Sequence, residues 1–253
     1  MADRRIPSLS VFLPAYNDAP SLPGLIEQTF AVASSLTDDF EVVVVNDGSW
    51  DNTDEVLGEL SGRFGERLRV VRHHVNRGYG GAVRSGFQAA GKDWVFYTDG
   101  DGQYDITELP RLVEAIAPGV GLVNGYKISR SDVFYRRWIG RIYLWGVRRL
   151  FGLRVRDVDC DFRIVKRSLL DQISLESTSG TICVELVRKL QDTGCEIVEI
   201  PVRHLPRLHG RSQFFRPWSL IHSLWQLAGF YFWYLGSRRN AAAAKESNVS
   251  PVA

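Results

Sequence analysis

The sequence contains few cysteines, no apolar leader and almost no net charge. Its 253 residues include three cysteines, Cys160, Cys183 and Cys195. They form neither an even set for disulfides nor a CxxC metal pair, so we expect core thiols in a reducing compartment. The first residues lack the apolar stretch of a signal peptide. Lys and Arg number 31 against 29 Asp and Glu, a net charge of +2. Whole-molecule attraction to nucleic acid is therefore not expected.

The order of apolar runs predicts an α/β fold. With 45% apolar and 24% charged residues, the composition is that of a globular protein. Short β-branched runs alternate with helical patterns, which predicts parallel strands joined by right-handed crossovers. Ligands of such sheets gather at the carboxyl ends of the strands. The expected strands are 9–13, 40–45, 69–72, 94–97, 119–124 and 195–202, and the expected helices are 21–36, 107–116 and 134–151, with others after Thr53 and Gly81.

The strongest chemical signal is TDGDGQYD, residues 98–105, at the end of the fourth expected strand. Asp99 and Asp101 lie two positions apart, and the glycines allow the backbone to turn so that the carboxylates converge. Two like charges ~4 Å apart repel by about 4 kcal/mol at an effective dielectric constant of about 20, which favours a divalent cation between them. Oxygen ligands suit Mg²⁺ or Mn²⁺. The alternative is a solvated acidic turn.

Two further groups of polar residues follow expected strands. Asp47 comes after the valine-rich strand and is a candidate acceptor for a nucleobase or ribose, whereas Asp51 and Thr53 are expected to cap the next helix. Tyr16 follows the first strand, where it either stacks on a base or packs. No GxGxxG accompanies it, which argues against a dinucleotide site. The pair His73 and His74 lacks metal-ligand spacing and is expected at a solvated strand edge.

Six motifs in order carry a resemblance to a known family. They are LPAYND, VVNDGSWDNT, NRGYGGAVRSGF, DGDGQYD, DCDFRIVKRSLL and EIPVRHLPRLHGRSQF. The chain resembles family-2 glycosyltransferases of the GT-A fold and, within them, polyprenyl-phosphate glycosyltransferases related to dolichol-phosphate mannosyltransferase. The resemblance covers about residues 8–215. It implies a GT-A domain over residues 1–215, with a mostly parallel central sheet flanked by helices.

The resemblance also implies site residues. Pro14, Tyr16 and Asp18 would border the nucleotide, with Asp18 in place of the family's usual Glu. Val45 and Asp47 would hold the base and ribose. The residues around the acidic motif would contact the sugar nucleotide and metal: Asp99, Gly100 and Asp101, with Gln103 as a further metal ligand. The turn glycines Gly78, Gly80 and Gly81 either contact ligand or only form a tight turn.

Basic residues complete the site that the resemblance implies. Arg207, Arg211 and Gln213 match the Arg-x-x-Gly-x-Ser-Lys loop that meets the diphosphate, with Gln213 where Lys is common. Lys127 lies near a family arginine. Asp157 corresponds to the acid ahead of a Phe-Arg pair and either orients the acceptor or braces an arginine in a structural salt bridge.

The charges between residues 127 and 156 indicate which kind of molecule would accept the sugar. A phosphomonoester is mostly a dianion at pH 7 and needs no general base, so its site should offer cations. This stretch interleaves nine Lys and Arg residues with aromatic ones, which fits an anionic lipid head at a membrane surface. The alternatives are a basic amphipathic helix that only touches the bilayer and a solvated basic face. Asp157, Asp159 and Asp161 keep a base-catalysed reaction open.

Residues 218–235 hold 13 apolar residues in 18, seven of them aromatic. Eighteen residues is the short limit for spanning a bilayer, so we expect residues 216–239 to form a membrane-contacting helix and residues 240–253 a disordered tail. A helix that spans the membrane is one alternative to a helix that lies on it, and a helix packed on the domain or in a dimer is another. The oligomeric state is left open, a homo-oligomer included.

The sequence thus predicts an inverting, metal-dependent hexosyltransferase at the cytoplasmic face of the cell membrane. It would move mannose or glucose from a GDP- or UDP-linked donor to a polyprenyl phosphate. The alternatives are a family-2 enzyme acting on a saccharide hydroxyl and a non-catalytic nucleotide-sugar binder.

Overall fold

The chain folds around one seven-stranded sheet with the order β3-β2-β1-β4-β6-β5-β7. This computed structural model describes residues 6–128, 134–207 and 217–247. Strand β6 runs antiparallel to β4 and β5, and the other neighbours are parallel. The predicted α/β fold with a mostly parallel sheet is confirmed. The strands are β1 (Leu9–Ala15), β2 (Phe40–Asn46), β3 (Leu68–Arg72), β4 (Trp94–Thr98), β5 (Val120–Lys127), β6 (Phe162–Lys166) and β7 (Glu196–Val202).

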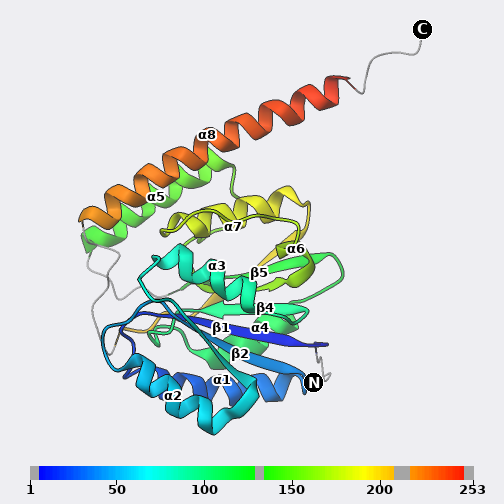
Figure 1. Ribbon diagram of the computed structural model, residues 1–253. Helices are drawn as coiled ribbons and strands as arrows, with labels where there is room; N and C mark the ends of the chain where they lie inside the picture. The colour runs from blue at the N-terminus through cyan, green and yellow to red at the C-terminus, as the bar shows by residue number, and fades with distance from the viewer. Residues whose placement is uncertain (1–5, 129–133, 208–216, 248–253) are drawn as a thin grey trace.

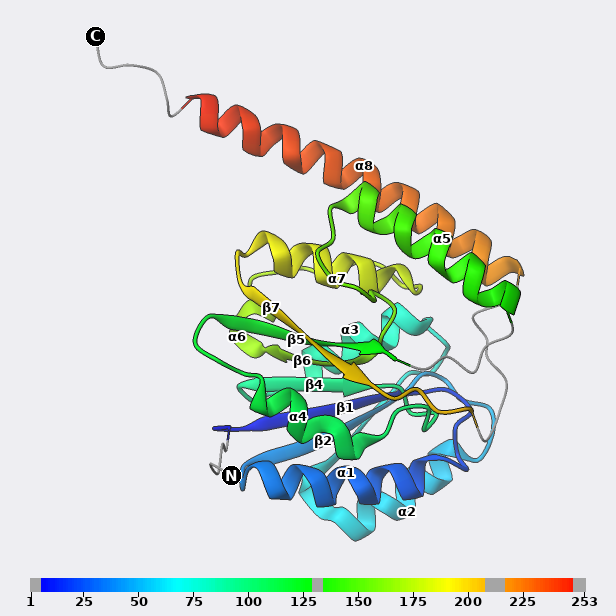
Figure 2. The ribbon, with the colours of Figure 1, turned by 180° about the vertical axis from the view of Figure 1, so that it is seen from behind.

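Helices cover both faces of the sheet (Figures 1 and 2). One face carries α1, α2 and α4, and the other carries α3 and α7, with α5 and α8 stacked outside α7. The helices are α1 (Leu22–Leu36), α2 (Thr53–Phe64), α3 (Tyr79–Ala89), α4 (Leu109–Glu114), α5 (Phe134–Phe151), α6 (Arg167–Leu170), α7 (Thr181–Asp192) and α8 (Pro217–Ser247), with 3-10 turns η1 (Gly65–Arg67) and η2 (Ile106–Glu108). The helix expected over 107–116 is thus divided between η2 and α4.

Strand β2 is apolar without alternation because both of its faces are buried. Val42 and Val44 enter the core on the α1 face, and Val43 and Val45 enter the core on the α3 face. Because side chains alternate along a strand, a strand buried on both faces is apolar throughout. The structure confirms this expectation and places the carboxyl end of β2 beside that of β1.

Helix α8 has one packed face and one exposed face. Phe230 and Tyr234 are buried against Phe151 of α5, with ring centroids 5.2 and 5.7 Å apart. Gln226 Oε1 accepts hydrogen bonds from the backbone N–H groups of Thr178 and Ser179. The packing alternative therefore holds for this face. The helix continues to Ser247, so the tail expected from residue 240 is helical that far, as its four consecutive alanines favour.

A glycine in α3 lets the helix pack closely on β1. A Cβ added to Gly86 would lie 2.3 Å from the ring of Phe12, whereas one added to Gly58 of α2 would meet nothing within 4 Å. We expect Gly86→Ala to lower the free energy of unfolding by about 1–3 kcal/mol, because overlap outweighs the gain in helix propensity. Gly58→Ala should raise it by about 0.5–1 kcal/mol. Urea unfolding measures both, and equal stabilities would contradict the close packing.

Candidate active site at the carboxyl ends of the strands

Loops from the ends of β1 and β4 are held together at the centre of the sheet. The N–H of Gly100 donates to the carbonyl of Pro14 at 3.0 Å. A Cβ on Gly100 would lie 2.9 Å from that carbonyl oxygen, so the contact requires glycine. Ser21 donates from Oγ to the carbonyls of Gly100 and Asp18 at 2.7 and 2.8 Å, and its side chain makes no capping hydrogen bond to α1. The predicted residues Pro14, Asp18 and Gly100 therefore lie together.

The carboxylates of Asp18, Asp99 and Asp101 gather where these loops meet, with Asp161 nearby. Burial, followed by the charges of Asp161 and Asp101, raises the pKa of Asp99 well above its usual value. Its Oδ1 atom is enclosed and has no hydrogen-bond partner within the described residues. Burial also raises the pKa of Asp18 to about 6, although the N–H of Tyr16 donates to its Oδ2 at 3.0 Å. The site thus concentrates negative charge in a poorly solvated place.

Arg207 supplies a positive charge to this cluster. Its guanidinium forms an ion pair with Oδ2 of Asp101, whose Oδ1 accepts the N–H of Gln103 at 2.9 Å. The chain after β7 reaches this position because it runs beside the acidic loop: the N–H of Leu205 donates to the carbonyl of Gln103 at 2.7 Å. A β-bridge between Tyr104 and His204 adds to this pairing. The fold therefore brings together Asp101 and Arg207, 106 positions apart.

The carboxylates of Asp99 and Asp101 fit a hard divalent cation by donor type. An enclosed carboxylate oxygen without a partner would be stabilised by a cation, and Mg²⁺ is commonly held by one or two carboxylates, water and substrate phosphates. Within the described ranges, no three His, Cys, Asp or Glu side chains are grouped so as to hold a metal ion by themselves. Gln103 directs its amide Nε2 to the carbonyl of Leu205 at 3.2 Å. Its predicted role as a third ligand stays a prediction.

Asp47 lies at the end of β2 with one carboxylate oxygen committed to the protein. Its Oδ1 is 2.6 Å from Nδ1 of His73 and accepts the N–H of Arg77 at 2.8 Å. His73 is 6% exposed, so its expected place at a solvated edge is wrong, while His74 is exposed. The missed signal was the position of His73, directly after β3, which the parallel sheet places beside the end of β2. Val45 is buried in the core, so only its backbone is available to a ligand.

Asn17 joins the loop after β1 to the loop after β2. This residue has a positive φ of 57°, which is uncommon outside glycine and costs backbone energy. Its N–H donates to Oγ of Ser49 at 3.0 Å, and its Oδ1 accepts the N–H of Trp50 at 2.9 Å. The sequence pattern alone does not mark Asn17 as a residue of the site. The neighbouring Tyr16 is half-buried, and its stacking on a base stays a prediction.

Lys127 and Asp157 lie together at the end of β5. The ammonium group of Lys127 donates to the carbonyl of Asp159 at 2.6 Å and lies 4.0 Å from Oδ2 of Asp157. Burial lowers the pKa of Lys127, but Asp157 and other acidic groups outweigh it and leave the pKa raised. Asp157 is 4% exposed, and its Oδ1 accepts the N–H of Asp159 at 3.2 Å. These contacts favour the bracing alternative for Asp157, although it braces a lysine rather than an arginine.

A fully buried arginine shapes the loop before β6. Arg163 donates from its guanidinium to the carbonyls of Val158 and Cys160, at 2.6–3.0 Å. It also lies 3.8 Å from Asp161, whose Oδ1 is 3.2 Å from Sγ of Cys183. Among the three free cysteines, Cys160 and Cys183 are buried as expected and Cys195 is half-buried. The arginine of the Phe-Arg pair thus fixes the backbone of residues 158–160, next to Asp161.

The glycine-rich turn before α3 packs against another loop. A Cβ on Gly78 or Gly80 would lie 2.5 or 2.4 Å from a carbonyl oxygen of residues 177–179. Gly80 also donates its N–H to the carbonyl of Thr178 at 2.9 Å. Close packing therefore accounts for these glycines without a ligand contact. The predicted phosphate-binding residues Arg211 and Gln213 lie outside the described residues.

Residues 10–174 match the sequence family described as glycosyl transferase family 2. The chain belongs to this family. Curated relatives include undecaprenyl-phosphate 4-deoxy-4-formamido-L-arabinose transferases from Pseudomonas paraeruginosa and Edwardsiella ictaluri. They are 35% and 32% identical over 208 and 211 residues, which cover 81% and 83% of this chain and 60% and 64% of theirs. The chain thus spans about 60% of the length of the curated relatives it matches.

Solved structures that are similar to this chain support the GT-A fold. Glucosyl-3-phosphoglycerate synthase from Mycobacterium tuberculosis, solved with Mn²⁺, UDP and glucosyl-3-phosphoglycerate, superposes with a TM-score of 0.67 at 22% identity. The match covers 90% of this chain and 80% of that one. A second structure of that enzyme, with Mg²⁺ and UDP, gives a TM-score of 0.66 at 21% identity over 88% and 79%. The predicted GT-A fold is confirmed.

The raised pKa of Asp18 predicts a pH dependence of stability. Between about pH 4 and 6 the folded chain keeps a proton on Asp18 that the unfolded chain has lost, because the pKa is about 6 in the fold and ordinarily 3.8. Stability contributed by this group therefore falls as pH rises through this window and stays lower above it. Asp18→Asn should flatten this slope and stabilise the protein at pH 8 by up to about 3 kcal/mol.

Urea unfolding at several pH values between 4 and 8 measures this effect. Glu59→Gln, which removes an exposed carboxylate of α2 away from this site, is the matched control. An Asp18→Asn variant that is less stable than the wild type at pH 8 would contradict the unfavourable burial of this carboxylate.

Proposed function

We propose that the chain is an inverting glycosyltransferase that moves a sugar from a nucleoside-diphosphate donor to a polyprenyl phosphate. The observation that carries the proposal is the convergence of Asp18, Asp99, Asp101 and Arg207 at the strand ends of a family-2 fold. The curated relatives are named undecaprenyl-phosphate transferases, which supports a lipid phosphate as the acceptor. Mannose or glucose is the expected sugar and UDP or GDP the expected nucleotide.

The reaction needs an acceptor oxygen, an anomeric carbon and a stabilised leaving group. An oxygen of the lipid phosphate attacks the anomeric carbon from the side opposite the diphosphate. The bond between that carbon and the diphosphate oxygen breaks, and the nucleoside diphosphate leaves with the electron pair, which inverts the configuration. No proton transfer is required, because the acceptor is already anionic.

The residues of the chain position the reactants and balance charge. Asp47 would hold the nucleoside, and Arg207 would neutralise charge on the leaving diphosphate. Asp99 and Asp101 would hold Mg²⁺ or Mn²⁺, which as a Lewis acid stabilises the diphosphate as it departs. Since Arg207 already pairs with Asp101, its guanidinium would lie beside a metal held by Asp101 and close to the leaving diphosphate.

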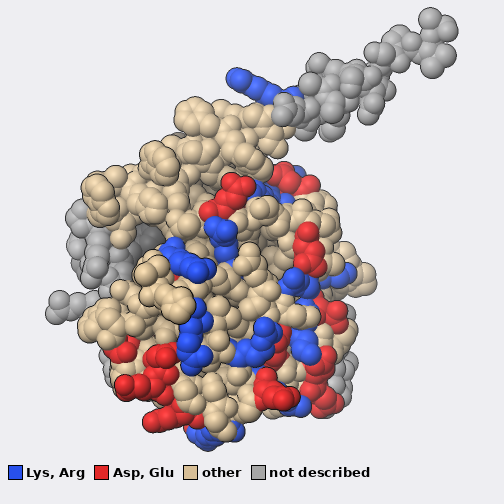
Figure 3. All heavy atoms as spheres, in the orientation of Figure 1, with Lys and Arg blue, Asp and Glu red and all other residues tan. Residues whose placement is uncertain are grey.

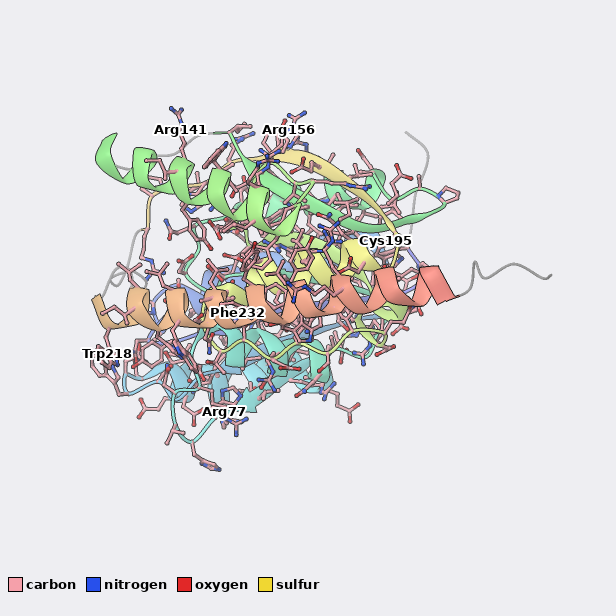
Figure 4. All side chains as sticks on the ribbon, turned by 90° about the horizontal axis from the view of Figure 1, so that it is seen from above. Arg77, Arg141, Arg156, Cys195, Trp218 and Phe232 are labelled. Carbon is pink, nitrogen blue, oxygen red and sulfur yellow. The ribbon has the colours of Figure 1, made fainter. Side chains whose placement is uncertain are left out.

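The paired helices α5 and α8 support a membrane-surface location. Their exposed faces carry large apolar side chains: Ile142, Trp145, Leu150, Trp218, Leu220, Ile221, Leu224, Trp225, Phe232 and Trp233. In Figure 3 the described part of α8 is almost free of charged atoms, whereas both signs are mixed over the domain beneath it. Seen from above, α5 and α8 lie apart at the Trp218 end of α8 and approach each other toward the carboxyl end of α5, where Phe151 packs on Phe230, and Arg141 points away from α8 (Figure 4).

Such a surface suits a membrane interface better than water. Apolar patches this extended are unusual on soluble monomers, and exposed basic residues flank this one: Arg141, Arg148, Arg149, Arg238 and Arg239. Among the helices of the described residues, none is long and apolar enough to cross a bilayer. We therefore propose that α8 lies on the cytoplasmic face of the membrane. A second copy of the chain on this face is the alternative.

Product formation tests the reaction. The full chain is incubated with a short polyprenyl phosphate, Mn²⁺ or Mg²⁺, and a panel of UDP- and GDP-linked sugars including 4-deoxy-4-formamido-L-arabinose, and labelled lipid product is measured. We expect product from the wild type and at least an about hundredfold lower rate for Asp101→Ala, because the diphosphate loses stabilisation. Asp105→Asn, in the same loop, is the control.

Two results would contradict the proposed reaction. Transfer to a free saccharide hydroxyl with none to lipid phosphate would favour the other family-2 activity. Nucleotide-sugar binding without turnover on either acceptor would favour a binding protein.

Vesicle binding tests the membrane surface. Co-sedimentation of the full chain should be stronger with vesicles containing anionic lipid than with neutral ones, and a Trp218→Ala/Trp225→Ala double variant should bind at least about tenfold more weakly. Trp50→Ala removes a tryptophan of similar exposure, 81%, from the loop between β2 and α2 and is the matched control. Equal binding by all three proteins would contradict the proposal, as would a dimer in solution that loses vesicle binding.

A further inference from the structure

Asp47, His73 and Ser85 form a chain of hydrogen bonds. Asp47 and His73 are buried and directly follow β2 and β3, and Ser85 is a half-buried residue of α3. Nδ1 of His73 lies 2.6 Å from Oδ1 of Asp47, and Nε2 lies 2.9 Å from Oγ of Ser85. The Asp47 and His73 side chains are 4% and 2% exposed. The proposed reaction uses Asp47 alone, so the other two residues call for an explanation.

The chemistry of the three groups sets the direction of these hydrogen bonds. A carboxylate only accepts, so Nδ1 of His73 carries the hydrogen that lies between the ring and Asp47. In the neutral imidazole Nε2 then accepts, and the hydroxyl of Ser85 donates to it. Asp47 therefore fixes the tautomer, and Ser85, whose hydroxyl meets Nε2, helps to fix the orientation of the ring that holds the carboxylate.

The two oxygens of Asp47 have different surroundings. Oδ1 is held by His73 and by the N–H of Arg77 at 2.8 Å, and Nδ2 of Asn76 donates to the backbone carbonyl of Asp47 at 3.1 Å. Within the described part of the chain, Oδ2 accepts no hydrogen bond. One oxygen is thus used by the scaffold, and the other is left for an N–H of a base or a ribose hydroxyl.

We propose that His73 is a positioning residue that holds the Asp47 carboxylate so that Oδ2 faces the nucleoside of the donor. This inference rests on the proposed function, in which Asp47 meets the base or ribose. Without the donor at Nδ1, the carboxylate turns toward other donors and no longer presents a fixed acceptor. Recognition of the nucleoside weakens, while contacts to the diphosphate, made elsewhere in the site, are kept.

The same three residue types form nucleophilic triads in hydrolases, in which serine attacks a carbonyl carbon. Ser85 lies inside α3, where the helix itself uses the neighbouring backbone N–H groups. Those groups are therefore not available to stabilise an oxyanion, and the structure favours positioning over nucleophilic catalysis.

Two substitutions separate positioning from packing. In His73→Asn the side-chain amide lies near the place of Nδ1 and still donates to Asp47, whereas in His73→Gln the amide reaches the place of Nε2 and the donor to Asp47 is lost. Calorimetry on the full chain measures the binding of UDP, GDP and inorganic pyrophosphate. We expect His73→Gln to bind the preferred nucleotide at least about tenfold more weakly and His73→Asn to stay within about threefold of the wild type.

Pyrophosphate binding and the control variant complete the design. Pyrophosphate should bind all variants equally, since it lacks a nucleoside, and His74→Ala should match the wild type because His74 is exposed. In the transfer assay, His73→Gln should raise the donor KM and leave kcat within about twofold. Thermal unfolding of each variant accompanies the titrations.

The outcomes distinguish this inference from the proposed function. A wild-type chain that binds neither UDP nor GDP would overturn the proposed function and the inference with it. Tight nucleotide binding by the wild type and by His73→Gln alike would overturn the inference alone. Equal losses in His73→Gln and His73→Asn, with weaker pyrophosphate binding and a lower unfolding temperature, would assign His73 a structural role and also overturn it.

Discussion

The site depends on one electrostatic constraint, the repulsion among carboxylates that the fold gathers at the end of β4. The charges of Asp101 and Asp161 raise the pKa of Asp99, and that of Asp101 raises the pKa of Asp18. Burial strengthens this repulsion because less water screens the charges. Within the described residues Arg207 forms an ion pair with Asp101, and the guanidinium of Arg163 lies 3.8 Å from Oδ1 of Asp161. A cluster of this kind is stabilised by further positive charge, which explains why a fold with this loop arrangement suits a cation and a diphosphate.

The remainder of the structure serves to hold these groups in place. The parallel sheet brings the ends of β1, β2 and β4 to one edge, and close contacts at Gly80, Gly86 and Gly100 leave no room for side chains between the layers. On the α3 side, Gln226 joins α8 to the loop of residues 177–179, and that loop packs on the glycine-rich turn. The apolar surface of α5 and α8 is therefore attached to the same framework that carries the site.

Much of the fold could be predicted from local pattern, and the pairing of distant side chains could not. The valine run of β2 is apolar throughout because both of its faces are covered, and this gives a strand whatever the partner sequences are. The acidic motif likewise predicts a strand-end site. The ion pair of Arg207 with Asp101 and the burial of His73 depend on which loops meet in space, which no local pattern encodes. The end of α8 at Ser247 lies beyond the expected residue 239, because the alanines after Asn240 favour continuation of the helix.

Titration of Mn²⁺ into the full chain, followed by electron paramagnetic resonance in the presence of UDP or GDP, tests the electrostatic constraint most directly. The account predicts one bound Mn²⁺ per chain and at least about tenfold weaker binding in both Asp99→Asn and Asp101→Asn, because each substitution removes one carboxylate charge from the cluster. Mn²⁺ binding of wild-type strength in both variants, or none in the wild type, would contradict it.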